Sequence, residues 1–126
     1  MITFYLPMPP TINHYYGQSG KRKFISDAGK KFRAKVQEIV AQAGHAIIEG
    51  RVMFAVSIHP ASKRKQDLDN RLKPLQDALT LAGVWIDDEQ IDVLHVVRRE
   101  VVKGGYVTVV ITELSAVKAK RDSGMN

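Results

Sequence analysis

The sequence contains no cysteine, and this absence excludes two kinds of small protein. Without thiols the chain forms neither a disulfide framework nor a thiolate metal site, so zinc-finger and zinc-ribbon modules are ruled out. No apolar run approaches the length of a membrane span, and no membrane contact is expected. The N-terminal stretch MITFYLPMPP lacks both a basic region and a long apolar region, which argues against a signal peptide.

Several common catalytic motifs are also missing from the chain. There is no phosphate-binding loop, no glycine-rich dinucleotide fingerprint and no serine nucleophile motif. The 4 histidines show no metal-ligand spacing.

Charge is the most informative global property of these 126 residues, which carry a net charge of +6. A basic protein favours a polyanionic partner, most simply nucleic acid, although a soluble protein can also be basic without such a partner. The basic residues gather in two segments: Lys21, Arg22, Lys23, Lys30, Lys31, Arg33 and Lys35, then Lys63, Arg64, Lys65, Arg71 and Lys73. The acids bunch elsewhere, at residues 87–92, so the pattern predicts a basic surface that surrounds an acidic spot.

The first half of the chain predicts a strand, a loop and a long helix. Alternating apolar residues indicate a strand over 2–6, and prolines and glycines indicate a loop over 8–23. Apolar residues at three- and four-residue intervals predict an amphipathic helix over 27–48. Ser26 or Asp27 is its expected N-cap, and Gly50 follows its expected end.

The second half predicts three strands and one helix. Residues 51–59 are apolar on both faces and indicate a covered strand. Leucine spacing predicts a helix over 70–82, with Pro74 in its first turn. Residues 93–102 and 106–112 indicate two strands joined by a glycine-containing hairpin turn. The expected fold is a single α+β domain over 1–114, with a mostly antiparallel sheet of about four strands, two main helices packed on it, and a polar, flexible tail over 115–126.

Two aspartates, Asp67 and Asp69, immediately precede the second helix. Residues two apart in an extended chain point the same way, so both carboxylates can reach one point. A structural explanation is also available, in which Asp69 or Asn70 caps the helix and Asp67 is a solvated loop charge.

Asp87 and Asp88 form a second acidic pair, which follows a short apolar run. The structural alternative is a polar turn or the first turn of a short helix. If the two pairs meet, three or four carboxylates share a site and need a neutralising cation. Carboxylate oxygens suit Mg²⁺ or Mn²⁺, and a phosphodiester is the natural substrate of such a site inside a basic surface.

Lys73 lies four residues after Asp69, about one helical turn along. Its charge could offset the negative charge that develops on a phosphate in the transition state. The structural alternative is an ordinary ion pair with Asp69 or Asp77 on the same helix.

The predicted DNA contacts come from the two basic segments and from the N-terminal loop. Tyr15 or Tyr16 could stack on unpaired bases, although adjacent tyrosines more often place one ring in the core. The candidate set is Asn13, Tyr15, Lys21, Arg22, Lys23, Lys30, Lys31, Arg33, Lys63, Arg64, Lys65 and Arg71.

Three motifs resemble the RusA family of Holliday-junction resolvases, over most of the chain. LPMPPTINHYY is similar to the family's opening, and DLDNRLKPLQDALTLAGVWIDDEQI to its central signature. VVKGGYVTVVITE resembles the family's closing hairpin. The combined spacing is far more specific than a lone D-x-D.

The resemblance implies a role for each acidic residue. Asp67, Asp69 and Asp88 match the family's essential metal-binding carboxylates, Asp87 a further acidic member, and Lys73 the catalytic lysine. It also implies a homodimer that binds four-way DNA junctions and nicks two opposed strands with Mg²⁺ or Mn²⁺, in the cytoplasm of a bacterial cell and often encoded by a phage. Gln66, where an arginine is usual, and Pro74, directly after the lysine, depart from the pattern.

Two rival functions share most of these features. One is a non-catalytic DNA-binding or recombination accessory protein, in which the acids only shape the surface. The other is a nuclease of the same chemistry that cuts other branched DNA, such as flaps or forks. The distance between the two acidic pairs bears most directly on this choice.

Overall fold

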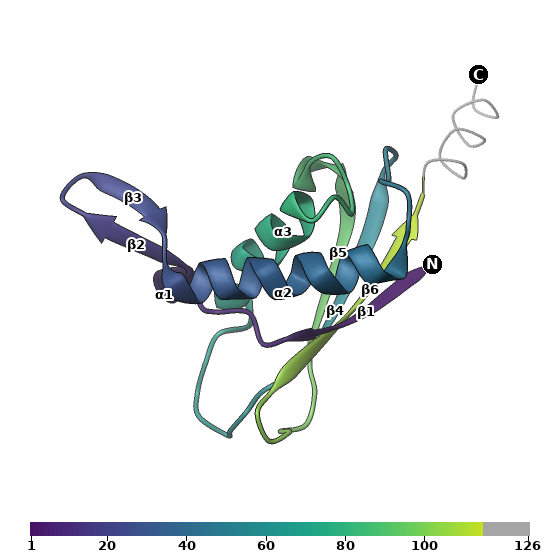
Figure 1. The fold of residues 1–126 in the computed structure, drawn as a ribbon. Helices are drawn as coiled ribbons and strands as arrows, with labels where there is room; N and C mark the ends of the chain where they lie inside the picture. Colours follow the sequence, from purple (N-terminus) through teal and green to yellow (C-terminus); the bar gives the residue numbers. More distant parts are fainter. Residues whose placement is uncertain (115–126) are drawn as a thin grey trace.

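A four-stranded sheet with two helices packed against it forms the body of the protein (Figure 1). The structure is a computed structural model that describes residues 1–114, and the predicted tail over 115–126 lies outside the described residues. The strand order is β1-β6-β4-β5, and only the β4–β5 pairing is parallel. The predicted α+β class and mostly antiparallel sheet are confirmed. The strands are β1 (Ile2–Pro7), β4 (Val52–His59), β5 (Ile91–Arg98) and β6 (Tyr106–Glu113).

The predicted hairpin between the last two strands is wrong, because β4 lies between β5 and β6. β5 joins the sheet parallel to β4 after a crossover through a helix, the usual route to a parallel neighbour. The chain then passes the end of β4, where Arg99 N donates to Ile58 O and Val102 N donates to Pro60 O. Gly104 and Gly105 both have positive φ and form a turn in this connection. The predicted turn is therefore confirmed, while the predicted pairing of β5 with β6 is not.

The long helix α2 (Asp27–Ala43) begins where the sequence predicts and ends earlier. Ser26 is its N-cap, and its Oγ accepts a hydrogen bond of 3.0 Å from Gly29 N. Gly44 ends the helix with φ of 68°, a left-handed conformation that glycine adopts without strain. The predicted end at Ile48 is therefore wrong, and Ile48 instead forms a β-bridge with Trp85.

The second helix, α3 (Leu72–Leu81), follows a 3-10 turn, η1 (Leu68–Arg71). Pro74 lies in its first turn, as predicted. Another 3-10 turn, η2 (Asp88–Gln90), leads into β5. These two turns carry the acidic residues, and α3 contacts both of them.

One hydrophobic cluster joins the sheet to both helices. Alternate residues of β6 point into it and are buried, as the two-residue period of a strand requires. Trp85 is fully buried, and its Nε1 donates to Thr80 Oγ1 at 2.7 Å, so the indole loses no hydrogen bond. Among the largest buried side chains are Tyr15, Phe54, Leu75, Leu79 and Ile111.

The segment predicted as a loop over 8–23 is partly ordered. It forms a short helix, α1 (Ile12–Tyr15), and a hairpin of β2 (Tyr16–Ser19) and β3 (Arg22–Ile25). This hairpin was not predicted from the sequence, because its strands are rich in polar residues and glycine. Gly20, with φ of 61°, lies in its tight turn. Figure 1 shows this hairpin, here called the arm, projecting from the body. No helix of the described residues is long and apolar enough to span a membrane.

Candidate active site

Asp67 and Asp69 lie at the 3-10 turn that leads into α3. Asp67 immediately precedes η1 in extended conformation, and Asp69 lies within it. Both side chains are exposed, and Asp67 makes no side-chain capping bond. The predicted helix cap at Asp69 or Asn70 is wrong, because the cap positions are Asp67 for η1 and Arg71 for α3, and neither makes a side-chain capping bond. The exposure of Asp67 agrees with the structural explanation that made it a solvated loop charge.

A cluster around Gln66 holds the chain just before these aspartates. Gln66 Oε1 accepts from Arg71 Nε at 3.1 Å and from Arg71 Nη2 at 3.0 Å. Arg71 also donates to Pro9 O, and Arg98 Nη2 donates to Gln66 O at 2.8 Å. Burial lowers the pKa of Arg71, which remains charged at neutral pH. Gln66, the departure from the family pattern, thus connects three parts of the chain, and Arg71, a predicted DNA contact, is engaged within the protein.

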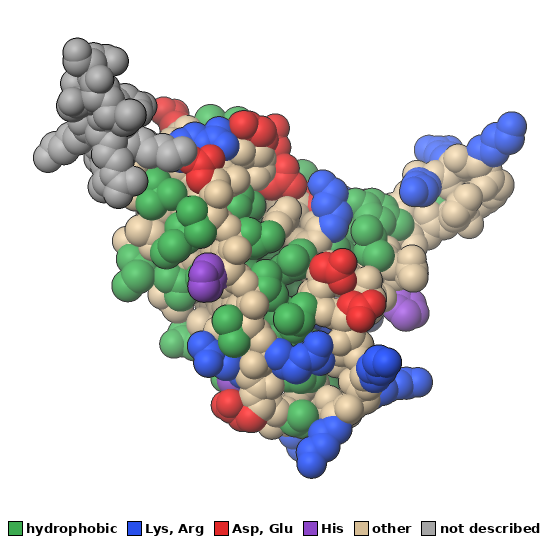
Figure 2. Space-filling view, turned by 180° about the vertical axis from the view of Figure 1, so that it is seen from behind, with side chains coloured by type: hydrophobic (Ala, Val, Ile, Leu, Met, Phe, Trp, Pro, Cys, Tyr) green, Lys and Arg blue, Asp and Glu red, His purple; other side chains and the backbone are tan. Residues whose placement is uncertain are grey.

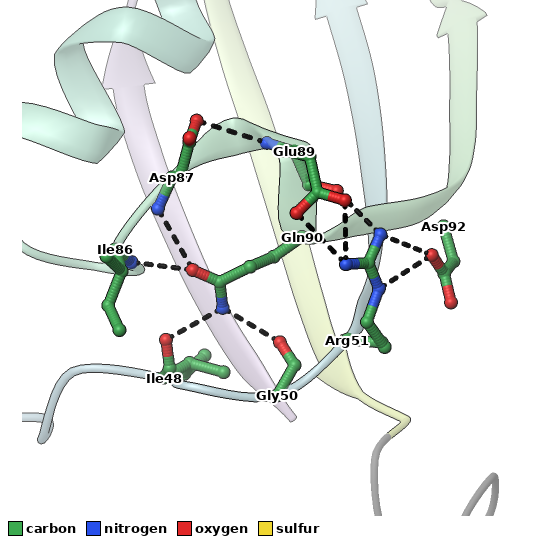
Figure 3. Close-up of polar contacts among 8 residues, drawn as sticks. All are labelled: Ile48, Gly50, Arg51, Ile86, Asp87, Glu89, Gln90 and Asp92. Carbon is green, nitrogen blue, oxygen red and sulfur yellow. Dashed lines mark hydrogen bonds and ion pairs between the residues drawn. The ribbon is translucent and has the colours of Figure 1, made fainter.

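Gln90 fixes the second acidic segment, as Figure 3 shows. Its Oε1 accepts from Ile86 N at 2.8 Å and from Asp87 N at 2.9 Å. Its Nε2 donates to Ile48 O at 2.9 Å and to Gly50 O at 2.8 Å. A buried glutamine with all these bonds made holds the loop rigidly against the core.

Asp87 is the N-cap of η2, and Asp88 lies in the first turn of this short helix, as the structural alternative predicts. Its Oδ1 accepts from Glu89 N at 3.3 Å, and Gln90 completes a capping box. Arg51 braces the same loop from outside, donating to Glu89 at 3.0 Å and to Asp92 at 2.8 Å (Figure 3). Gln90 thus holds the loop from the core side and Arg51 from the outside, and Asp88 lies within this loop.

Lys73 contacts the second acidic segment from the start of α3. It lies in the first turn of α3, directly after η1, and its Nζ is 3.5 Å from Asp88 Oδ2. This ion pair replaces the predicted pairing with Asp69, while the positive charge of Lys73 still contributes to lowering the pKa of Asp77. The lysine therefore lies beside one carboxylate that the family resemblance marks as essential.

The predicted gathering of carboxylates around one cation is not present in this structure. Within residues 1–114, no group of three or more histidine, cysteine, aspartate or glutamate side chains is arranged to hold a metal ion. The donor set has the chemistry that Mg²⁺ prefers, although its side chains do not gather around one point in this conformation. In this conformation the cation next to Asp88 is the ammonium group of Lys73.

Basic residues flank the acidic ones on two sides. Figure 2 shows acidic side chains between the lysines and arginines of the arm and those at the other end of this face. The arm carries Lys21, Arg22 and Lys23, and the loop before η1 carries Lys63, Arg64 and Lys65; all six are exposed, as are Lys30 and Lys31 on α2. Two hollows, of about 390 Å³ and about 550 Å³, border that loop, and Ser62 and Arg64 line both.

Tyr15, proposed from the sequence as a DNA contact, is fully buried, and this prediction is wrong. Its hydroxyl donates to Asp77 and accepts from Arg33 Nε at 2.5 Å, and Arg33 Nη2 lies 2.6 Å from Asp77 Oδ2. Arg33 is thus also engaged inside the protein. Asn13 is exposed and borders a hollow of about 410 Å³ at the base of the arm.

Sequence reasoning missed Gln90 and Arg51, although both fix the acidic loop. A signal for Gln90 was present, since an aspartate followed three residues later by glutamine is a capping-box pattern. Arg51 carried no local signal, because its partners lie about forty residues away in the chain.

Acidic residues and a lysine that lie between basic surfaces are typical of an enzyme that acts on a nucleic-acid backbone. The comparisons with known proteins make the class specific. The family model described as Endodeoxyribonuclease RusA matches residues 7–112. The chain belongs to this family of endonucleases, and the resemblance stated from its motifs is confirmed.

Its relatives come from phages and bacteria. The chain is 42% identical over 115 residues to the crossover junction endodeoxyribonuclease of Enterobacteria phage HK97, covering 90% of this chain and 96% of the relative. It is 39% identical over 110 residues to the protein of that name from Shigella sonnei, covering 86% and 92%. A third such protein, from Enterobacteria phage 82, is 38% identical over 112 residues, covering 86% and 92%.

Proposed function

We propose that this protein is a structure-selective endodeoxyribonuclease that resolves four-way (Holliday) DNA junctions by paired nicking. The observation that carries the proposal is the family match over residues 7–112, which contains Lys73, Asp88 and the D-x-D pair. The names of the relatives specify a crossover junction as the substrate. The basic surfaces beside the acidic residues fit a polyanion.

The proposed catalytic residues are Asp67, Asp69, Asp88 and Lys73, and the metal-binding set adds Asp87. Mg²⁺, with Mn²⁺ as a substitute, would supply an activated water and charge neutralisation at the scissile phosphate. Lys73 would offset the negative charge that develops on that phosphate. Its ion pair with Asp88 keeps the ammonium group at the site. Gln90 and Arg51 keep the Asp88 loop fixed.

We also propose a homodimer. A four-way junction has approximate two-fold symmetry, and a two-fold dimer presents equivalent sites to symmetry-related strands. A single site would nick one strand only. The exposed basic residues of the arm and of the loop before η1, together with Lys30 and Lys31 of α2, would bind the phosphates of the DNA. With a DNA substrate and bacterial and phage relatives, the cytoplasm is the expected location.

The test is to incubate the protein with a synthetic four-way junction and with linear duplex, with and without Mg²⁺. We expect paired, symmetric nicks in the junction only when Mg²⁺ is present. Asp69→Asn should bind the junction with wild-type affinity and cut it at least a hundredfold more slowly, because it keeps the shape of Asp69 but loses a charged ligand.

Three other results would contradict parts of this proposal. Junction binding without cutting, in both proteins and with either Mg²⁺ or Mn²⁺, would identify a non-catalytic accessory protein. Faster cutting of flaps or forks than of four-way junctions would identify a nuclease with another substrate. Cutting by Asp69→Asn at the wild-type rate would remove Asp69 from the proposed site.

A further inference from the structure

Phe24 is an exposed aromatic residue on the projecting arm. It lies in β3, and 47% of its surface is accessible to solvent. It is not among the residues that form or pack against the hydrophobic core. Burial in the protein therefore does not explain a large aromatic ring at this position, and an aromatic ring exposed beside cations suits a planar ligand.

Gly17 fixes where the ring lies. Gly17 pairs with Phe24 across the hairpin, and a Cβ atom added at Gly17 would lie 2.3 Å from Phe24 Cε2 and 2.5 Å from Phe24 Cζ. Any side chain at residue 17 would push the ring away. The glycine thus lets the ring rest directly on the opposite strand while nearly half of the residue stays open.

Three basic residues directly precede Phe24 in the sequence of the arm. Arg22 is two residues from Phe24 in the same strand and therefore points to the same face of the hairpin. Lys23 points to the other face, and Lys21 lies in the turn. All three side chains are exposed. Phe24 and Arg22 together present an apolar ring and a phosphate-binding group on one surface.

We propose that Phe24, backed by Gly17 and accompanied by Arg22, is a stacking site for one unpaired nucleobase at the branch point of a DNA substrate. Aromatic rings beside cations bind single-stranded bases by stacking, with little dependence on sequence. A linear duplex offers no unpaired base, whereas strands that exchange at a branch have bases that can leave their stack. The arm therefore distinguishes branched from linear DNA. This inference rests on the proposed function, since it takes branched DNA as the ligand.

The experiment compares the binding of a four-way junction with that of a linear duplex of the same arm sequence, in EDTA. Phe24→Ala should weaken junction binding about five- to a hundredfold, the loss expected for one stacked base. Duplex binding should change less than about twofold, because phosphate contacts through the basic residues remain. Phe24→Tyr should restore junction binding, and Gly17→Ala should weaken it by displacing the ring.

A second measurement locates the contact. With 5-iodouracil at the branch point, ultraviolet light should crosslink the junction to the peptide that contains Phe24, and not to that of Phe24→Ala. Circular dichroism should give the same melting temperature for both proteins, since Phe24 lies outside the core. Equal affinities of the wild type and Phe24→Ala for the junction would overturn the proposal, as would equal losses for junction and duplex. Because binding is measured without Mg²⁺, it does not depend on cleavage. A wild-type protein that fails to cut the junction in the separate assay with Mg²⁺ would refute the nuclease assignment without affecting this result.

Discussion

Lys73 is the residue whose chemistry is most directly testable. Its ammonium lies 3.5 Å from Asp88, and its side chain is 55% exposed. Lys73→Ala should slow junction cleavage about 10²- to 10³-fold, as the loss of one charge-stabilising group does, and should leave junction binding nearly unchanged. The melting temperature should also stay unchanged, because an exposed ion pair contributes little stability. Single-turnover cleavage and equilibrium binding measure the two effects.

Lys35 offers a matched control for that substitution. It is also 55% exposed and lies 3.4 Å from Glu38 on α2, in an ion pair remote in sequence from the acidic residues. Lys35→Ala should cut at the wild-type rate. If both variants cut equally fast, Lys73 has only the structural role of an ion-pair partner.

Gln90 should contribute more to stability than any charge at the site. Its four hydrogen bonds to backbone atoms are made by a side chain that is only 6% exposed. Gln90→Ala should lower the free energy of unfolding by about 2–5 kcal/mol, since each bond contributes about 1 kcal/mol and the backbone groups lose their partner. Denaturant unfolding measures this, with Gln42→Ala, on the exposed side of α2, as the control. Equal unfolding curves for the two variants would contradict the bracing role.

At the scale of elements, Tyr15, Arg33 and Asp77 join α1, α2 and α3. Burial alone would raise the pKa of Asp77, but hydrogen bonds from Tyr15 and Arg33 and the charges of Arg33 and Lys73 lower it below its ordinary value. Burial and the bond to Asp77 raise the pKa of Tyr15, which keeps the hydroxyl neutral. The cluster therefore carries a carboxylate that stabilises the fold only while it is ionised.

This cluster predicts how the free energy of unfolding changes at acidic pH. A lowered folded-state pKa stabilises the fold above the unfolded pKa, about 3.9, and the stabilisation is lost as pH falls through the folded value. Asp77→Asn should be less stable than wild type at pH 7, and this difference in stability should shrink as the pH falls below the unfolded pKa, about 3.9. Thermal unfolding followed by circular dichroism as the pH is lowered measures this difference. A difference that stays constant with pH would show that the ionisation of Asp77 does not matter.

Elements with a strong period were predictable from the sequence. The α2 pattern, its Ser26 cap and the position of Pro74 in α3 follow from local rules, because the contacts involved lie within a few residues. The arm was missed because its strands are short and polar. Strand pairing was also missed, since β5 and β6 lie close in sequence while each pairs with β4.

At the scale of the whole molecule, one face of the sheet remains open. Residues of β6 that alternate with the buried ones are half-buried, and Tyr5 of β1, which pairs with Thr108, is 69% exposed. Val93 and Val97 of β5 pair with outward residues of β4 and are 39% and 36% exposed. This apolar open face is where we expect the proposed homodimer to form.

A charge on the open face should therefore separate the protomers. Tyr5→Arg should reduce the mass in solution from twice to once the 14.1 kDa of the chain, because a dimer would bury the charge without a partner. Light scattering after size exclusion measures this mass. Leu81→Arg, at an exposed apolar residue on α3, is the control and should remain dimeric. A wild-type monomer at micromolar concentration would refute the dimer.

The sequence by itself determined the family and the two main helices and supplied the candidate catalytic residues, since these depend on residue type and short spacing along the chain. Only the tertiary structure decided that Lys73 contacts Asp88, that Tyr15 is buried and that Phe24 is exposed on an arm. It also decided that the carboxylates within the described residues form no ready metal site. These outcomes depend on which distant segments pack together, and packing is set by the sum of contacts over the whole core, not by any local pattern.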